Sequence, residues 1–269
     1  MKLAVPGINI GTGAGVPSAS NENGVSVLKT VRSAWAAVPK AIAPTLTALA
    51  VLSAISAGAA ATLFWFRLHA VAFVAGYVSI LMALAVLLHC GSAAAVGKPA
   101  PWMPWVFLRR IVFWKSAACT FLIVSAAVAA ALAAFGGIYQ GWGSMLRLSP
   151  GSRDAAYLAL AAFSSAYFAG IAIALKLSLV IPSVADTGNA SFRSSWVRTR
   201  GSAMKIWFAY VVATFPLSVI PVFLQYLTRD TALAPALPFL SAASACLNAL
   251  VTGAVCGSAH VQLAVKEHR

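Results

Sequence analysis

The hydrophobic residues of this chain form long continuous runs rather than alternating with polar residues. A helix that crosses the roughly 30 Å hydrocarbon core of a membrane needs about 20 mostly apolar residues. Runs of that length occupy residues 42–64, 70–90, 117–139, 156–181, 206–227 and 236–263. Because a transmembrane strand would alternate apolar and polar positions, the pattern predicts an all-α integral membrane protein with six transmembrane helices.

The basic residues are divided unequally between the segments that connect these runs. Fourteen Lys and Arg residues lie in the tail up to residue 41, in segments 91–116 and 182–205, and at the C-terminal end. The alternate connections hold only Arg67, Arg147, Arg153 and Arg229. Lys and Arg are enriched in the cytoplasmic loops of membrane proteins. We therefore predict that both termini are cytoplasmic.

The basic segment 182–205 has the pattern of a short amphipathic helix. Phe192 and Trp196 are four residues apart and would share one face of it. The remaining positions carry Arg193, Arg198 and Arg200. Such a helix would lie in the membrane interface, with its aromatic rings among acyl chains and its guanidinium groups among lipid phosphates.

Local sequence signals give the expected ends of that helix and two further helices of the same kind. Asn189 or Ser191 would cap its N-terminus, and Gly201 would end it. Residues 25–38 and residues 101–116 also mix basic and aromatic positions, and the second segment begins with prolines suited to a first helical turn. We predict three such interfacial helices on the cytoplasmic side.

The spacing of the tryptophans in these segments raises the question of an internal repeat. Trp35, Trp114 and Trp196 are separated by 79 and 82 residues. One interpretation is three hairpin repeats, over residues 25–90, 101–181 and 189–263. The alternative is that any six-span protein divides into three hairpins with basic aromatic segments at each inner boundary. In both cases the domain organisation is one transmembrane domain over 25–265, between a flexible tail 1–24 and a C-terminal tail 266–269.

The overall composition agrees with a membrane protein. Hydrophobic residues make up 61% of the chain and charged residues 9%, whereas soluble domains carry about 25% charged residues. The net charge of +14 is distributed between apolar runs, so it indicates anionic membrane lipids rather than nucleic acid as a partner. The four cysteines lack the spacing of a secreted disulfide framework, and we expect them to be buried and reduced.

The segment around residues 176–201 resembles a known membrane family. The resemblance is to the six-helix membrane domain fused to some glycerophosphodiester phosphodiesterases and to its stand-alone bacterial relatives. In that family a basic residue and a Pro near the end of the fourth span precede an acidic residue and a Ser-Trp-x-x-Thr-x-Gly segment. The matching positions are Lys176, Pro182, Asp186, Ser195, Trp196, Thr199 and Gly201. Helix order extends the resemblance over residues 25–265, but its specific part covers only about 25 residues.

The resemblance implies a fold and a location rather than an activity. It implies a six-helix domain in a bacterial cytoplasmic membrane. The catalytic barrel of the fused enzymes has no counterpart here, because the transmembrane runs leave no room for it in this sequence. We therefore do not expect phosphodiesterase activity.

The acidic residues indicate that the protein is not an enzyme. All five lie in predicted connections or tails, namely Glu22, Asp154, Asp186, Asp230 and Glu267. Proton-coupled carriers place carboxylates or histidines within the membrane, and acid–base hydrolysis commonly uses paired carboxylates. The chain also has no Walker-type phosphate loop and no His-Glu-x-x-His sequence. We predict no enzymatic activity and no cofactor.

A metal site is a weaker interpretation of the histidines and cysteines. Cys256 and His260 are four residues apart, and His89, Cys90 and Cys119 are predicted near the same membrane surface. Nitrogen and sulfur ligands suit zinc or copper. Small cysteines are also common in helix packing, and no Cys-x-x-Cys sequence is present. The sequence therefore predicts packing roles and no metal site.

Lys176 is the one charged residue within a predicted transmembrane run. It could bind an anionic substrate or a lipid phosphate in a cavity. Alternatively, its side chain extends to the cytoplasmic headgroups or reaches Asp186, which is the interpretation that we favour. Asp186 itself could cap a helix or pair with Arg193 or Arg198.

Three polar or helix-bending residues complete the candidates. Asn248, near the middle of the last run, is predicted to bond to a neighbouring helix. Pro216 and Pro221 predict a kink or a break in residues 206–227. A broken helix can line a transport site, but the same prolines can serve packing, which we favour.

These observations predict a structural or accessory protein of the bacterial cytoplasmic membrane. Its basic cytoplasmic face would bind anionic lipid headgroups, a protein partner or a second copy of the chain, and no nucleic acid. The alternative is a permease-like or lipid-handling transporter with a site near Lys176. The residues that would carry either function are Lys176, Asp186, Arg193, Trp196, Arg198, Arg200 and Asn248.

Overall fold

The computed structural model describes residues 25–66, 68–101, 103–145, 152–228 and 237–267, and in these ranges it contains helices and no strand. The helices are α1 (Val27–Trp65), α2 (His69–Ala95), α3 (Pro104–Arg109), α4 (Ile111–Met145), α5 (Arg153–Leu177), α6 (Val180–Thr187), α7 (Phe192–Arg198), α8 (Ala203–Thr228) and α9 (Leu237–Glu267). The predicted tail 1–24 lies outside the described residues, and α9 continues into the predicted C-terminal tail.

The predicted class of an all-α, multi-pass membrane protein is confirmed. Six helical segments are long and apolar enough to cross a membrane. They are Val27–Leu63, Ala70–Ala95, Ile111–Trp142, Arg153–Thr187, Ala203–Leu224 and Leu237–Val265. Each contains one of the predicted runs nearly whole, and most extend beyond it.

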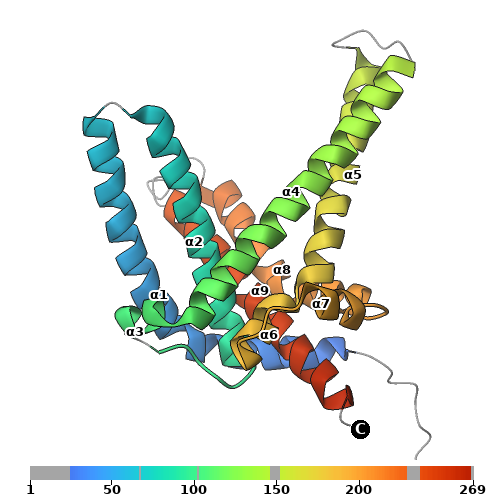
Figure 1. Cartoon of the computed structure of the whole chain (residues 1–269). Coiled ribbons are helices and arrows are strands. Elements are labelled where there is room, and N and C mark those ends of the chain that lie inside the picture. Colours follow the sequence, from blue (N-terminus) through green and yellow to red (C-terminus); the bar gives the residue numbers. More distant parts are fainter. Residues whose placement is uncertain (1–24, 67, 102, 146–151, 229–236, 268–269) are drawn as a thin grey trace, which may run out of the picture.

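The long helices converge at one end of the molecule and diverge above it (Figure 1). We call the converging end, which carries α3, α6 and α7, the base. Three hairpins rise from it: α1 packs on α2, α4 on α5, and α8 on α9. The α4–α5 hairpin tilts away from the α1–α2 hairpin, and α2 and α6 are among its contacts at the base. The shape concentrates the packing between hairpins near the base.

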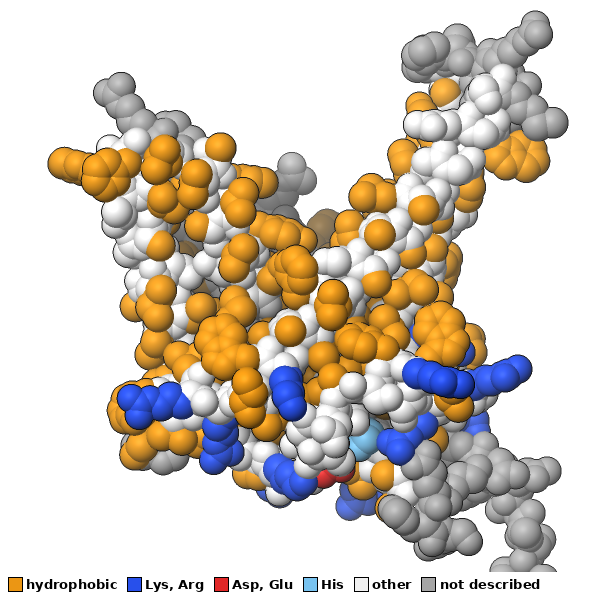
Figure 2. Space-filling model, in the orientation of Figure 1, with side chains coloured by type: hydrophobic (Ala, Val, Ile, Leu, Met, Phe, Trp, Pro, Cys, Tyr) orange, Lys and Arg blue, Asp and Glu red, His pale blue; other side chains and the backbone are white. Residues whose placement is uncertain are grey.

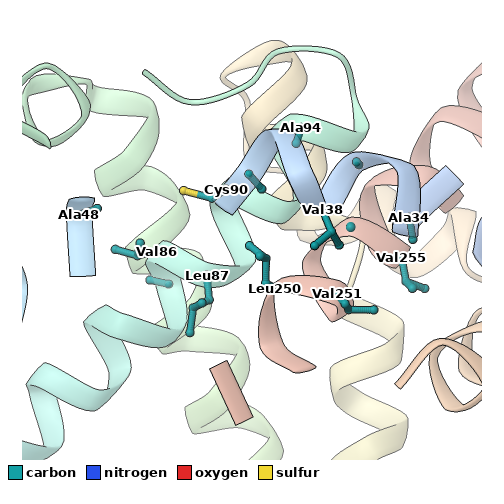
Figure 3. Packing of buried hydrophobic residues seen from close by; sticks show 14 of the residues in the cluster. Ala34, Val38, Ala48, Val86, Leu87, Cys90, Ala94, Leu250, Val251 and Val255 are labelled. Carbon is teal, nitrogen blue, oxygen red and sulfur yellow. The ribbon is translucent and has the colours of Figure 1, made fainter. Parts of the chain in front are cut away.

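The main core consists largely of small and branched side chains of α1, α2 and α9 (Figure 3), and residues of α3, α4 and α8 complete it. Val38 of α1, Cys90 of α2 and Val251 of α9 are examples, and each is nearly inaccessible to solvent. Two smaller clusters join α4 to α6, and α6 to the starts of α1 and α8 and the end of α9. The three clusters tie the hairpins together at the base.

Glycines bring the backbones of α2 and α9 into direct contact. A Cβ atom placed on Gly91 would overlap the Leu250 carbonyl, and one placed on Gly253 would overlap the Leu88 carbonyl. The Ser92 hydroxyl also donates to the Gly253 carbonyl over 2.9 Å. Small residues drive helix association in membranes because they allow this close approach. The α2–α9 contact is therefore a central packing element of the fold.

The predicted interfacial helix at residues 25–38 is not separate from the first span. It forms the first turns of α1, which continues through Pro39 and Pro44. Figure 1 shows these turns lying across the base before the helix rises. Each proline lacks an N–H group, so the helix bends here without ending.

The second predicted interfacial helix, residues 101–116, is instead divided in two. It breaks at the extended residue Arg110, between α3 and α4. The Trp114 indole N–H donates to the Leu108 carbonyl over 2.7 Å, and in a continuous helix that carbonyl would accept from Val112. As predicted, a proline, Pro104, occupies the first turn of α3.

The fourth run also divides, whereas the fifth does not. The break between α5 and α6 follows from the Ser178 hydroxyl, which bonds the Leu175 carbonyl, and from Pro182 in the first turn of α6. In α8, Pro216 and Pro221 lie inside one continuous helix. Pro221 cannot bond the Leu217 carbonyl, and the Ser244 hydroxyl of α9 donates to that carbonyl instead. The prolines thus take part in helix packing, as we favoured.

The glycine contact predicts a position-specific effect of adding one methyl group. Gly91→Ala and Gly253→Ala should each destabilise the protein by about 1–3 kcal/mol, because the new Cβ atom collides with backbone rather than with a movable side chain. Thermal unfolding in detergent, followed by tryptophan fluorescence, measures this loss.

Gly58→Ala and Gly136→Ala are the matched controls, because no atom lies within 4 Å of the added Cβ in either helix. They should leave the midpoint unchanged or raise it. Equal effects at all four glycines would show that α2 and α9 are not in backbone contact.

Candidate functional site

The four basic segments of the chain meet at the base. The N-terminal segment contacts the end of α9, where Gln262 accepts from Ser26 N–H over 3.0 Å and donates to the Thr30 hydroxyl over 2.9 Å. The segment after α2 contacts the segment after α6 through Lys98 and Lys115. Figure 2 shows Lys and Arg side chains in a band along the base, below arms covered by hydrophobic side chains. We call the Lys and Arg residues of these four segments the basic collar.

Asp186, at the end of α6, holds three segments of the base together. Its Oδ1 atom accepts from Lys98 Nζ over 2.8 Å, and its backbone carbonyl accepts from the same ammonium. Its Oδ2 atom lies 3.5 Å from Nε2 of His260 in α9. Lys115 Nζ adds a bond to the Gly188 carbonyl over 2.9 Å. We expected Lys176, Arg193 or Arg198 as partners of Asp186, whereas the ionic contacts described for its carboxylate are with Lys98 and His260.

Lys176 lies at the junction of α5 and α7. Its ammonium is 5.7 Å from the ring centroid of Trp196, which is the geometry of a cation–π contact. Its backbone carbonyl accepts from the Ser195 hydroxyl over 2.9 Å, and the Thr199 hydroxyl lies 3.3 Å from it, a longer contact than the 2.9 Å between that hydroxyl and the Ser195 carbonyl. Both hydroxyl-bearing residues are buried. These contacts satisfy a carbonyl at the C-terminal end of α5, which the helix itself leaves unpaired.

These contacts give a physical reason for the Ser-Trp-x-x-Thr-x-Gly pattern. Ser195 and Thr199 bond the end of α5, and Trp196 covers the Lys176 ammonium. Gly201 has φ +82°, a conformation that favours glycine, and the chain turns there into α8. The pattern therefore fixes the short helix α7 against α5.

The predicted N-terminal end of α7 is confirmed, but the helix ends at Arg198 with Thr199 as its C-cap, before the turn at Gly201. Ser191 is its N-cap and accepts from Ser194 N–H over 3.2 Å, while Asn189 lies outside the helix. Trp196 is 47% exposed despite its contact with Lys176. An open groove of about 360 Å³ runs beside the helix, and its lining includes Arg193 and Arg198. Arg200 is exposed and follows the helix directly.

Asn248 takes part in a contact of a different kind. Its amide donates to the Ser218 hydroxyl of α8 over 3.3 Å. The predicted bond to a neighbouring helix is therefore present. It lies within the α8–α9 hairpin, and no described hydrogen bond links it to Lys176 or Asp186.

The histidines and cysteines are distributed among several contacts. Nδ1 of His89 lies 2.8 Å from the Ser116 hydroxyl, and His260 faces Asp186. All four cysteines are free; Cys90 and Cys119 are buried, but Cys246 is exposed on α9, contrary to our expectation. Among the described residues no three His, Cys, Asp or Glu side chains are grouped so that they could hold a metal ion.

Sequence reasoning missed the roles of Lys98, Lys115 and His260 in the base. Each lies on a segment far from Asp186 in the sequence. A basic residue next to a span is usually interpreted as a mark of the cytoplasmic side rather than as the partner of a particular carboxylate. One clue was available: Asp186 is the single acidic residue in a segment with four basic residues. A carboxylate in that position needs a cationic partner.

Comparison of the chain with protein-family models, with curated proteins and with solved structures gave no match.

We expect the protein to lose stability when the hydroxyl groups of Ser195 and Thr199 are removed from the α5–α7 junction. Thr199→Val keeps the shape of the side chain and Ser195→Ala removes one atom. Ser195→Ala leaves a bond to the Lys176 carbonyl unmade, and Thr199→Val leaves the hydroxyl contacts with the Ser195 and Lys176 carbonyls unmade, each at about 1 kcal/mol. The double variant should unfold several degrees below wild type in a detergent thermal scan. Ser194→Ala is the control on the same helix, and a double variant as stable as that control would contradict this role.

Proposed function

We propose that this is an accessory protein of the bacterial cytoplasmic membrane, with both termini in the cytosol, whose basic collar binds anionic lipid headgroups. The observation that carries the proposal is the meeting of four basic segments at one end of a six-span protein. Lys98, Lys115 and Lys176 take part in the contacts that assemble this end. The collar would thus lie at the cytoplasmic leaflet, where Lys- and Arg-rich loops are enriched and anionic lipid headgroups are present.

Exposed aromatic side chains at the level of the collar are typical of a membrane–water interface at this end of the helices. Trp35 and Trp196 are 37% and 47% exposed, and Trp114 is 49% exposed. Indole rings favour the headgroup region because they combine an apolar ring with an N–H donor. Basic groups beside these rings would lie within reach of lipid phosphates.

The transporter alternative gains no support from the contacts of Lys176. A substrate site would leave the ammonium available in a cavity, but here it lies over the ring of Trp196. The prolines of α8 lie in a continuous helix whose freed carbonyl is bonded by Ser244. Both features have a structural explanation.

The collar predicts a charge-dependent preference for anionic lipid. Reversal of Arg193, Arg198 and Arg200 to Glu should strongly reduce retention of phosphatidylglycerol. At about 1 kcal/mol for each basic residue near the surface, the loss in affinity is roughly 100-fold. The measurement is the ratio of phosphatidylglycerol to phosphatidylethanolamine that copurifies from mixed micelles.

The matched control reverses three arginines of the alternate connections, Arg67, Arg147 and Arg229. It changes the net charge of the protein by the same amount and should preserve the lipid ratio. A wild-type ratio in the first triple variant, or the same loss in both, would remove the proposal.

A further inference from the structure

A small cavity lies at the base, apart from the groove beside α7. It has a volume of about 130 Å³, and its lining includes His89, Lys98, Phe107, Arg110, Phe113 and Ala185. At roughly 10–15 Å³ for each water molecule, the space holds several waters, and so also a tetrahedral oxyanion. None of its six named lining residues belongs to α7.

A nearly buried histidine forms part of the cavity wall. His89 is 6% exposed, and its ring lies beside those of Phe107 and Phe113, with centroid distances of 5.6 and 6.1 Å. Its Nδ1 atom pairs with the Ser116 hydroxyl, whereas Nε2 has no hydrogen-bond partner among the described residues. If the hydroxyl donates to Nδ1, then Nε2 carries the proton and is a donor. A polar atom in such apolar surroundings calls for a ligand or a water.

Positive charge surrounds the same space from two directions. Arg110 lines the cavity and occupies the break between α3 and α4. The break exposes the N-terminus of the 35-residue helix α4, and Val112 and Phe113 of its first turn are also in the wall. A helix N-terminus presents free N–H groups and a partial positive charge. In α4 the Phe113 N–H bonds the Arg110 carbonyl over 3.0 Å, so the first-turn N–H groups left to a ligand are those of Ile111 and Val112. Lys98 adds a second cation, but Asp186 pairs with it.

We propose that this cavity binds a phosphate oxyanion, either free phosphate or the phosphate of a lipid headgroup. The Arg110 guanidinium and the first turn of α4 would hold the anion, and His89 Nε2–H would donate to one of its oxygens. This site goes beyond the lipid preference of the collar, because it is a single defined position with residues of its own. It can be present whether or not the collar selects anionic lipids.

Adjacent arginines provide a matched test. Both Arg109 and Arg110 are exposed, but only Arg110 is in the cavity wall. The full chain is purified in dodecyl maltoside, whose headgroup contains no phosphate, and inorganic phosphate is titrated at constant ionic strength in a calorimeter. We expect saturable binding at one site. Arg110→Gln should weaken it at least tenfold, as for loss of a charge-assisted hydrogen bond, and Arg109→Gln less than twofold.

A second variant tests whether phosphate binds in the cavity, and addition of lipid distinguishes free phosphate from a lipid phosphate as the ligand. Ala185→Leu fills the cavity without changing the charge and should also abolish phosphate binding. Addition of phosphatidylglycerol to the micelles should block the phosphate titration if the site takes a lipid phosphate, and should leave it unchanged if the ligand is free phosphate. Absence of saturable phosphate binding, or an equal effect of Arg109→Gln and Arg110→Gln, would overturn the proposal.

Discussion

Hydrocarbon cannot accept or donate hydrogen bonds, and this constraint determines where every polar contact of the molecule lies. Within the spans, many hydroxyl groups bond a carbonyl of their own helix, as Ser79 and Ser164 do, and others bond a neighbouring helix, as when Ser244 bonds the carbonyl that Pro221 leaves unpaired. The ionic contacts lie at the base, where Lys98 meets Asp186 and Lys176 meets Trp196. Hydrogen bonds within the spans are thus separated from ionic contacts at the base, and the helices diverge in the apolar region but are joined at one end.

The base is held by two mechanisms that act on different parts of it. In the apolar part, glycines let α2 and α9 approach so closely that backbone atoms touch, and dispersion forces act over the whole contact. In the polar part, side chains bond the ends of helices: Asp186 joins α6 to α9, and Ser195 and Thr199 join α7 to α5. The first mechanism sets the positions of the spans, and the second sets the positions of the short helices that carry the collar.

The spans could be predicted from the sequence because length and hydropathy alone define a segment that can cross a membrane. The N-terminal end of α7 could be predicted because Ser191 caps it through local backbone geometry, and a turn could be predicted at Gly201, which follows the helix. The break at Arg110 could not, because no Pro or Gly stands there and the bond that accompanies it comes from a side chain, the Trp114 indole, rather than from a backbone signal. The partners of Asp186 were also beyond reach, because Lys98 and His260 come close only when separate hairpins pack together.

The side of the membrane that the basic collar faces is central to the proposed function, and a topology assay measures it directly. Alkaline phosphatase, which needs the oxidising periplasm for its disulfides, is fused after residue 269 or after residue 150, between the third and fourth spans. We expect alkaline phosphatase to be inactive after residue 269 and active after residue 150. Green fluorescent protein fused after residue 269 instead should be fluorescent. Phosphatase activity at the C-terminal position would place the collar in the periplasm and contradict the account.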